Sequence, residues 1–298
     1  MTIPLADEEL RRLAELALAE DRADHDVTTA ALVPPDQRGR GVIIAKAPGV
    51  LAGLPVAAAV FATVDASLAW RPLKQDGEPV SRGDRVATIQ GSLASILRGE
   101  RVALNFLTHL SGIATATARV VQALQGTNCR LRDTRKTTPG LRVLEKYAVR
   151  AGGGTSHRAS LADAVLIKDN HLAALRARGL GVADAVRLAT QANPGLTVEI
   201  EVTTVEEARQ ALDAFAEDGS TSGGGAHELL LDNMPVEQMR EVAALAASYD
   251  PRPVLEASGG ITLENARQVA ETGVDFISMG AITHSAKALD LSLELEAV

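Results

Sequence analysis

The sequence is poor in cysteine, in aromatic residues and in long hydrophobic runs. The single cysteine, Cys129, excludes an intrachain disulfide and a cysteine-cluster zinc site. Only 2% of the residues are aromatic and the net charge is -8, so the basic, aromatic-rich surface that binds nucleic acids is not expected. No stretch approaches the ~20 uninterrupted apolar residues that cross a membrane. We therefore expect neither a nucleic-acid partner nor a membrane partner.

The N-terminus lacks the features of a secretory signal. Residues 1–20 form an acidic, amphipathic segment without a basic start or an apolar core. The 298 residues, 46% hydrophobic and 23% charged, have the composition of a soluble globular protein with ample core. We expect a cytoplasmic protein in which Cys129 packs in a buried strand and is not a catalytic thiol.

The pattern of apolar segments changes along the chain and predicts two domains. In residues 1–110, short strands and turns alternate with helical segments, which predicts an α+β sandwich domain. A long helical pattern covers residues 96–124, with an interruption expected near Ser111–Gly112. In residues 111–285, strand-like apolar runs alternate with helical patterns, which predicts βα repeats around a parallel sheet. The expected fold is α/β: a C-terminal TIM-like β/α barrel, closed or incomplete, with the N-terminal sandwich.

Six apolar runs of the second domain end at residues that can bind ligands or shape a turn. These ends are Asp133, Lys168, Glu201, Asp232, Ser258 and Gly280. In a β/α barrel the carboxyl ends of the strands meet at one face, where active sites lie. The coincidence predicts a single shared active site at this face.

Cations are concentrated in one window, residues 133–171. It holds seven Lys/Arg against four acids, +3 in a chain of net charge -8. This favours a focused field for an anionic ligand. Arg142, Lys146 and Arg150 follow each other at steps of four and are expected to form a solvated helix stripe. The other cations stand at strand ends and glycine turns, which favours a binding site.

Several motifs in the same order resemble the quinolinate phosphoribosyltransferase family. Within the window they are TRKT, PGLR, LEKYAV, GGG, HR and LIKDNH; outside it they are ERVALN, EIEV, LLLDN, EASGGI and GAITHS. The resemblance covers nearly the whole chain. It implies decarboxylating transfer of a phosphoribosyl group to quinolinate in NAD biosynthesis, and a tail, residues 286–298, that completes the N-terminal domain.

The resemblance implies a pocket for the two adjacent carboxylates of quinolinate. Arginine suits such a ligand because its planar fork matches a carboxylate. The candidates are Arg101, Arg135, His157 and Arg158. Arg101, Asn105 and His109 by themselves read as a solvent-exposed helix stripe, but the resemblance implies that Arg101 reaches the neighbouring subunit of a homodimer. For His157, the other interpretation is a core histidine that donates to a carbonyl.

The second implied substrate is 5-phosphoribosyl-1-pyrophosphate. Its phosphate is expected at glycine turns after the last two strands, where backbone N–H groups can approach it. The residues are Ser258, Gly259, Gly260, Gly280, Ala281 and His284. Lys136 and Lys168 are expected to neutralise the diphosphate. Mg²⁺ prefers oxygen ligands, so Glu201 and Asp232 are expected to bind it or the ribose hydroxyls.

Three expectations concern details of these segments. Only one of Glu199 and Glu201 is expected to face the barrel interior, and the family pattern selects Glu201. The Gly-rich segment Asp218–His227 is expected to be a mobile surface insertion. Whether dimers associate further is left open.

Other functions are also compatible with the sequence. A barrel lyase would use Lys168 as a Schiff-base nucleophile, and a non-enzymatic binding protein would leave the ionisable strand ends unexplained. Nicotinate as acceptor would leave part of the cationic pocket unpaired. Relatives that use another acceptor form the remaining alternative.

Overall fold

The computed structural model describes residues 6–218 and 227–296, which form two compact units. The first unit contains the described residues up to Ala118, then Thr137–Gly153 and the described residues from Ala281 onward. The second contains Arg119–Lys136 and the described part of Gly154–Gly280. Most of the Gly-rich segment Asp218–His227 lies outside the described residues. Nowhere in 6–218 or 227–296 is a helix both long and apolar enough to cross a membrane.

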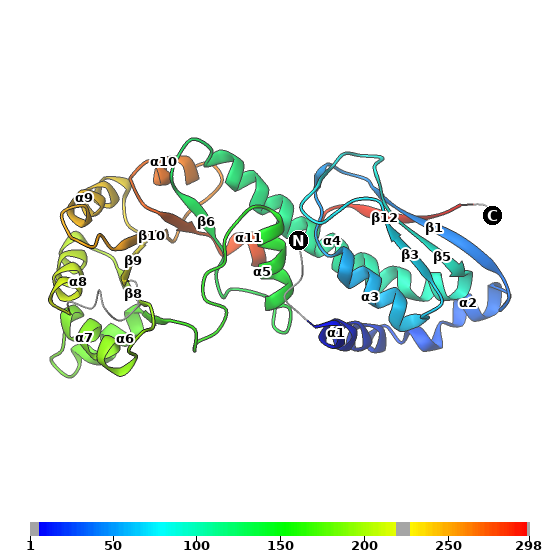
Figure 1. The fold of residues 1–298 in the computed structure, drawn as a ribbon, viewed down its shortest axis with the longest axis horizontal. Helices are drawn as coiled ribbons and strands as arrows, with labels where there is room; N and C mark the ends of the chain where they lie inside the picture. The colour runs from blue at the N-terminus through cyan, green and yellow to red at the C-terminus, as the bar shows by residue number, and fades with distance from the viewer. Residues whose placement is uncertain (1–5, 219–226, 297–298) are drawn as a thin grey trace. The chain divides into compact units, whose positions relative to one another are not determined.

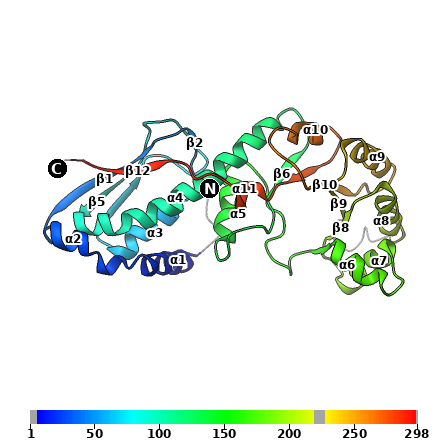
Figure 2. The ribbon, with the colours of Figure 1, turned by 180° about the vertical axis from the view of Figure 1, so that it is seen from behind.

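The first unit is built on a four-stranded antiparallel sheet (Figures 1 and 2). The strand order is β12-β1-β5-β3, with β1 (Arg38–Ala45) paired to both β5 (Arg85–Ser92) and β12 (Leu291–Glu296). The remaining elements are α1 (Asp7–Glu20), η1 (Ala23–His25), α2 (Val27–Leu32), β2 (Gly49–Val50), α3 (Leu54–Val64), β3 (Ala69–Pro72), β4 (Pro79–Val80), α4 (Leu93–Ala123), α5 (Arg142–Ala151) and α11 (Ala281–His284). Helix α4 continues past Ala118 into the second unit.

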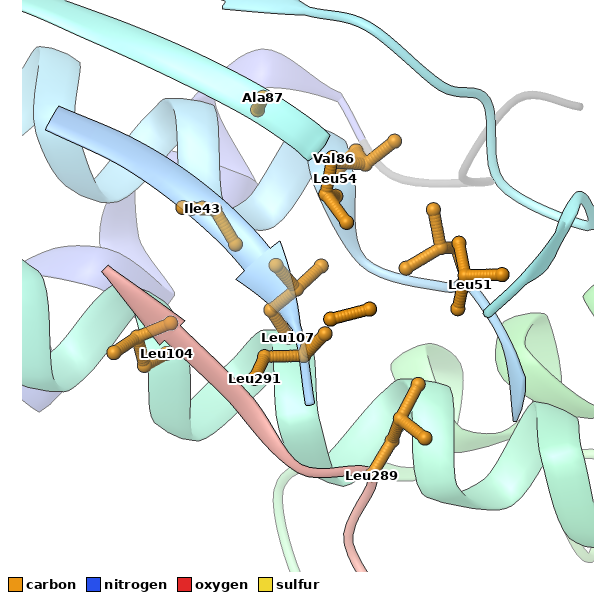
Figure 3. Packing of buried hydrophobic residues seen from close by; sticks show 11 residues of the cluster. Ile43, Leu51, Leu54, Val86, Ala87, Leu104, Leu107, Leu289 and Leu291 are labelled. Atoms are coloured by element: carbon orange, nitrogen blue, oxygen red, sulfur yellow. The ribbon is translucent and has the colours of Figure 1, made fainter. Parts of the chain in front are cut away.

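The C-terminal segment is part of the core of this unit. Leu289 and Leu291, 5% and 6% exposed, belong to one cluster with Ile43 of β1 and Leu104 and Leu107 of α4 (Figure 3). Burying a leucine side chain stabilises a fold by about 1.5–3 kcal/mol. Leu289 and Leu291 therefore help to hold β12 against β1.

Helix α4 has no interruption at Ser111–Gly112, so that expectation is wrong. A Cβ at Gly112 would lie 2.4 Å from the backbone oxygen of Lys287. The glycine permits the segment before β12 to approach the helix closely, and the helix itself stays regular. The Ser111 hydroxyl is fully buried, donates to the Ala52 carbonyl and accepts from the Ala52 amide.

Helix α5 belongs to the first unit, although the sequence placed residues 111–285 together in the barrel domain. Two polar contacts connect it there. The Tyr147 hydroxyl donates to Asp76 at 2.6 Å, and Glu145, fully buried, bonds His109 of α4 at 2.9 Å. The expected solvated stripe on this helix is also wrong, because Lys146 is only 3% exposed.

The second unit contains a six-stranded parallel sheet in the order β6-β11-β10-β9-β8-β7. The strands are β6 (Arg130–Arg132), β7 (Val165–Ile167), β8 (Val198–Val202), β9 (His227–Asp232), β10 (Val254–Ser258) and β11 (Phe276–Ser278). The helices are α6 (Asp169–Arg176), α7 (Val182–Ala192), α8 (Val205–Asp218), α9 (Val236–Ala246) and α10 (Ala266–Ala270). Figure 1 shows α8 and α9 on the outside of the curved sheet. The alternation confirms the predicted βα repeats.

The sheet is a TIM-like barrel of the incomplete kind in the residues described. Strands β6 and β7 are its two ends, and no pairing joins them in the described part of the chain. Thr155 instead adds an isolated parallel bridge to Arg132, beside β6. Cys129, just before β6, is 6% exposed, and burial raises the pKa of its thiol to about 12. Such a thiol is not activated as a nucleophile.

Candidate active site

A cavity of about 700 Å³ opens at the carboxyl ends of the barrel strands, within the second unit. Its lining is strongly polar and includes groups from all six strand ends. The lining residues are Asp133, Thr134, Arg135, Lys136, His157, Arg158, Leu166, Lys168, Asp169, Glu201, Leu230, Asp232, Asn233, Glu256, Ser258, Gly259, Gly260 and Ser278. The structure thus brings most of the candidate residues together, as a barrel whose strand ends share one face requires.

Five cationic or ionisable nitrogen side chains surround this cavity: Arg135, Lys136, His157, Arg158 and Lys168. A hydrogen bond holds the Arg158 side chain in place, because its Nη1 donates to the Ala164 carbonyl at 2.9 Å. Burial and the nearby positive charge of Arg135 lower the pKa of Arg158, but a guanidinium stays protonated in proteins. Crowded cations of this kind are stabilised by an anion with more than one negative group.

Lys168 and Glu201 form an ion pair between the carboxyl ends of β7 and β8. The backbone N–H of Asp169, at the start of α6, also approaches Glu201 at 3.4 Å. The Lys168 side chain is 45% exposed and Glu201 is 12% exposed. This arrangement places a lysine and a carboxylate on one side of the cavity, near Asp232 of β9 among the lining residues.

His157 is fixed by hydrogen bonds at both ring nitrogens. Its Nε2 lies 2.8 Å from Glu199 Oε2, and the backbone N–H of Arg158 donates to its Nδ1 at 2.8 Å. Its own backbone N–H donates to Asp133 at 2.9 Å. Burial lowers the pKa of His157, but Glu199 and Glu256 outweigh this and raise it overall. The backbone N–H of Arg158 instead favours the neutral ring, because it donates to a lone pair on Nδ1 that a protonated imidazolium does not have. The geometry therefore assigns the Nε2–H to the bond with Glu199.

Glu199 and Glu201 both face the barrel interior, so the expectation that only one does so is wrong. Residues two apart on a strand point to the same side of the sheet. Glu201 reaches the cavity, while Glu199, 2% exposed, lies beneath it and bonds His157. The sequence contained this signal in the spacing of the two glutamates.

Beneath the cavity lies a buried ionic cluster that the sequence analysis missed. Arg132 Nη1 donates to Glu228 at 2.6 Å and to Glu256 at 2.8 Å, and its guanidinium stacks 3.4 Å from the ring centre of Phe276. Glu256 is 1% exposed. Charged residues within strand-like apolar runs were the available signal, since buried charges require partners.

The Ser258–Gly260 segment makes a tight turn at the cavity edge. Gly259 and Gly260 have φ values of +84° and +63°, which favour glycine. A Cβ at Gly259 would lie 2.3 Å from the Asn233 side chain, so only glycine fits beside it. The Asn233 N–H donates to the Ser258 carbonyl at 2.8 Å, which joins the ends of β9 and β10.

Four candidate residues are not among those that line the cavity. Arg101 is exposed on α4 in the first unit, and Ala281 and His284 belong to α11 of the same unit. His284 Nδ1 contacts the Ser285 hydroxyl at 2.6 Å. Gly280 ends the second unit but is not part of the lining either; Ser278, two residues earlier, is. Ser278 is buried at the end of β11 and was not anticipated.

Comparisons with known proteins agree with this geometry. Residues 26–111 match the N-terminal domain model of quinolinate phosphoribosyl transferase, and residues 113–294 match its C-terminal domain model. The chain is 43% identical to a nicotinate-nucleotide pyrophosphorylase [carboxylating] of Mycobacterium leprae, over 94% of each chain. It is 38% identical to a quinolinate phosphoribosyltransferase [decarboxylating] of Nicotiana tabacum, covering 97% of this chain and 82% of the relative.

Solved structures show the same relationship. The nicotinate-nucleotide pyrophosphorylase from Francisella tularensis superposes with a TM-score of 0.87 at 36% identity, covering 99% of this chain and 98% of that one. The match extends over nearly the whole of both chains. This chain belongs to the quinolinate phosphoribosyltransferase family.

Proposed function

We propose that this protein transfers the phosphoribosyl group of 5-phosphoribosyl-1-pyrophosphate to quinolinate and removes one carboxylate. The products are nicotinate mononucleotide, pyrophosphate and CO2, a reaction of NAD biosynthesis in the cytoplasm. The observation that carries this proposal is one cavity whose lining joins Arg135, His157 and Arg158 with the Ser258–Gly260 turn. Such a lining suits a dicarboxylate and a phosphate at the same time.

The cationic side of the cavity suits quinolinate. Arg135 and Arg158 offer guanidinium forks that match two adjacent carboxylates. His157, held between Glu199 and the Arg158 backbone, defines the shape of this side. Nicotinate, with one carboxylate, would leave one of these cations without a partner in a partly desolvated site, which is unfavourable.

The glycine turn and the lysines of the cavity suit the phosphoribosyl donor. The turn at Gly259 and Gly260 allows a phosphate to approach backbone N–H groups, and Ser258 adds a hydroxyl. In our proposal Lys136 and Lys168 neutralise the departing diphosphate, so that Lys168 exchanges its pairing with Glu201 for the substrate. His284, Gly280 and Ala281 remain proposed contacts of the phosphate.

A divalent cation fits the donor set of this cavity. Glu201 and Asp232 supply carboxylate oxygens, the ligands that Mg²⁺ prefers, and the described lining contains no sulfur ligand. Mg²⁺ bound there would offset the negative charge that develops on pyrophosphate. The two carboxylates can instead accept hydrogen bonds from the ribose hydroxyls, which orients the reacting carbon.

The chemistry requires the protein mainly to position and stabilise charge. The pyridine nitrogen attacks C1 of the ribose as pyrophosphate leaves, and the ring becomes a cationic pyridinium. That ring then accepts the electron pair released when the 2-carboxylate departs as CO2. A ring carbanion remains and takes up a proton.

We also propose a homodimer in which Arg101 completes the quinolinate pocket of the neighbouring subunit. Arg101 is exposed on α4, so it is accessible to a second chain. Arg101→Ala should reduce quinolinate turnover without changing the secondary structure. In mixtures with an inactive Arg135→Ala chain, activity should recover partly, because one hybrid site then contains both arginines. Failure of the mixture to recover would argue against a shared site.

The test of the function is an assay with Mg²⁺, phosphoribosyl pyrophosphate and either quinolinate or nicotinate, in which mononucleotide and CO2 are followed. We expect both products from quinolinate alone. Product from nicotinate without CO2 would contradict the dicarboxylate pocket. A lyase that uses Lys168 is disfavoured by its ion pair with Glu201, since Schiff-base lysines are activated by burial or cationic neighbours.

A further inference from the structure

Glu256 occupies an unusual position at the base of the cavity. It lines the cavity although it is only 1% exposed. Its Oε2 accepts from Arg132 Nη1 at 2.8 Å and lies 3.9 Å from His157 Nε2. The site described above assigns no role to this carboxyl group, and a buried carboxyl at the end of a substrate cavity requires an explanation.

Glu256 lies in a cluster of carboxylates with little access to water. Glu199, Glu228 and Glu256 supply three carboxylates; Arg132 forms ion pairs with Glu228 and Glu256, and His157 contacts Glu199 at 2.8 Å. Arg132 is thus shared between two of them, while the charge of Arg158 also acts on Glu199. Burial and the negative charge of Glu199 favour the protonated form of Glu256.

The proposed reaction needs a proton at the stage when CO2 has left. We propose that Glu256 is the acid that protonates the ring carbon. The bond between C2 and its carboxylate breaks, its electron pair stays on C2, and CO2 departs. The C2 carbanion then takes the proton of the Glu256 carboxyl group, which forms the C2–H bond and leaves a carboxylate paired to Arg132. Solvent that enters through the cavity returns the proton before the next turnover. This inference rests on the proposed function.

Glu256 is better suited to this task than the other buried carboxyl of the lining. Asp133 is fully buried, but its Oδ1 accepts the backbone N–H of His157 at 2.9 Å and so helps to hold that segment in place. For Glu256, burial and the negative charge of Glu199 outweigh His157 and Arg132 and raise its pKa to about 7. An acid with a pKa near the working pH donates and regains its proton most efficiently.

The ionisable groups near Glu256 come from several segments of the barrel, while β11, which pairs with β10, places Phe276 beside it. Arg132 and Cys129 belong to β6 and the residue before it, Glu228 to β9 and Glu199 to β8, and His157 follows the Thr155 bridge. Cys129 stays protonated, because burial raises the pKa of its thiol to about 12. His157 is the rival source of the same proton, since its ring also lines the cavity.

The test separates phosphoribosyl transfer from decarboxylation in single turnovers. Rapid-quench measurements would follow pyrophosphate release and CO2 release for wild type, Glu256→Gln and the matched control Glu228→Gln, which removes the other carboxylate on Arg132. In Glu256→Gln we expect pyrophosphate release within a few-fold of wild type. CO2 release into solution and nicotinate mononucleotide formation should fall by about 100-fold, as for loss of a general acid, because the unprotonated carbanion recombines with CO2 in the cavity, and the dicarboxylate mononucleotide should accumulate. Glu228→Gln should affect both steps equally and weakly.

The dependence on pH supplies the second measurement. Wild-type CO2 release should decline as the pH rises above about 7, where Glu256 loses its proton, and this decline should be absent from the residual activity of Glu256→Gln. Glu256→Asp, which keeps an acid, should restore part of the CO2 release and move the decline, so it serves if Glu256→Gln does not fold. Wild-type CO2 release by Glu256→Gln, or equal losses in both glutamine variants, would overturn the inference. Wild type that releases no pyrophosphate with quinolinate would instead refute the proposed function itself.

Discussion

The buried position of Glu256 predicts a dependence of stability on pH that requires no substrate. Its pKa is raised from 4.5 to about 7 in the folded protein, mainly by burial. Below 4.5 the carboxyl group is protonated in both the folded and the unfolded chain, so it contributes nothing to the pH dependence. As the pH rises from 4.5 to about 7, the unfolded chain ionises first and is stabilised. Stability is therefore lost across this window, and the loss levels off above it.

The magnitude follows from the width of the window. A pKa difference of one corresponds to 1.36 kcal/mol, so the interval from 4.5 to about 7 corresponds to about 3 kcal/mol of unfolding free energy. Glu256→Gln removes the titration and keeps an oxygen that can accept from Arg132. Relative to wild type, this variant should therefore gain about 3 kcal/mol of stability between pH 4.5 and pH 8. Titrating groups remote from Glu256 are common to both proteins and cancel in the difference, whereas His157, whose pKa Glu256 helps to raise, changes as well.

Urea unfolding at a series of pH values, followed by far-UV circular dichroism, measures this difference. Fluorescence is unsuitable because the single tryptophan, Trp70, lies in the first unit. Glu228→Gln is the matched control, because it removes the other carboxylate that is paired with Arg132. A stability difference between Glu256→Gln and wild type that stays constant from pH 4.5 to pH 8 would refute a raised pKa for Glu256.

Three further predictions address the site and its support. Arg135→Ala should lower kcat/KM for quinolinate by at least about 100-fold, because a buried carboxylate of the substrate loses its guanidinium partner. The control Arg176→Ala, which removes an exposed ion pair of α6, should change kcat/KM less than about two-fold. Equal effects of the two variants in steady-state assays would contradict the proposed quinolinate pocket. Treatment with a chelator should abolish turnover, and Mg²⁺ should restore it; full activity without a divalent cation would exclude the proposed ion. Tyr147→Phe should destabilise the first unit by about 1–3 kcal/mol, because Asp76 loses a hydroxyl donor 2.6 Å away, and an unchanged Trp70 unfolding transition would show that this bond contributes nothing.

The strand ends were predictable from the sequence because one physical rule places them. Each strand-like run is apolar and ends where the chain becomes polar, so Asp232 and Ser258 were recognised as ends that the structure also has. In a parallel barrel all such ends meet at one face. The grouping of Arg135, Lys168 and Glu201 around one cavity therefore required no knowledge of the tertiary contacts.

Other features depend on contacts between distant segments and could not be predicted in this way. The polarity of α5 indicated a solvated face, but Lys146 is buried because the helix packs within the first unit. Gly112 indicated a break in α4, whereas it makes space for the backbone of Lys287. In both cases the residue was recognised correctly as polar or small. Its structural role depends on a neighbouring segment that lies far away in the sequence.

The barrel interior shows one recurring spacing that connects these two kinds of feature. On β8, Glu201 lines the cavity and Glu199, two residues earlier, is buried beneath it; on β10, Ser258 and Glu256 have the same spacing, and Glu256, although buried, also lines the cavity. A period of two places such residues on one face of a strand, in successive layers of the barrel. In the lower layer, Glu199 bonds His157 Nε2 at 2.8 Å, and Glu256 Oε2 lies 3.9 Å from the same nitrogen while also lining the cavity. Both glutamates, each two residues before one of these positions, therefore lie against His157, which itself lines the cavity.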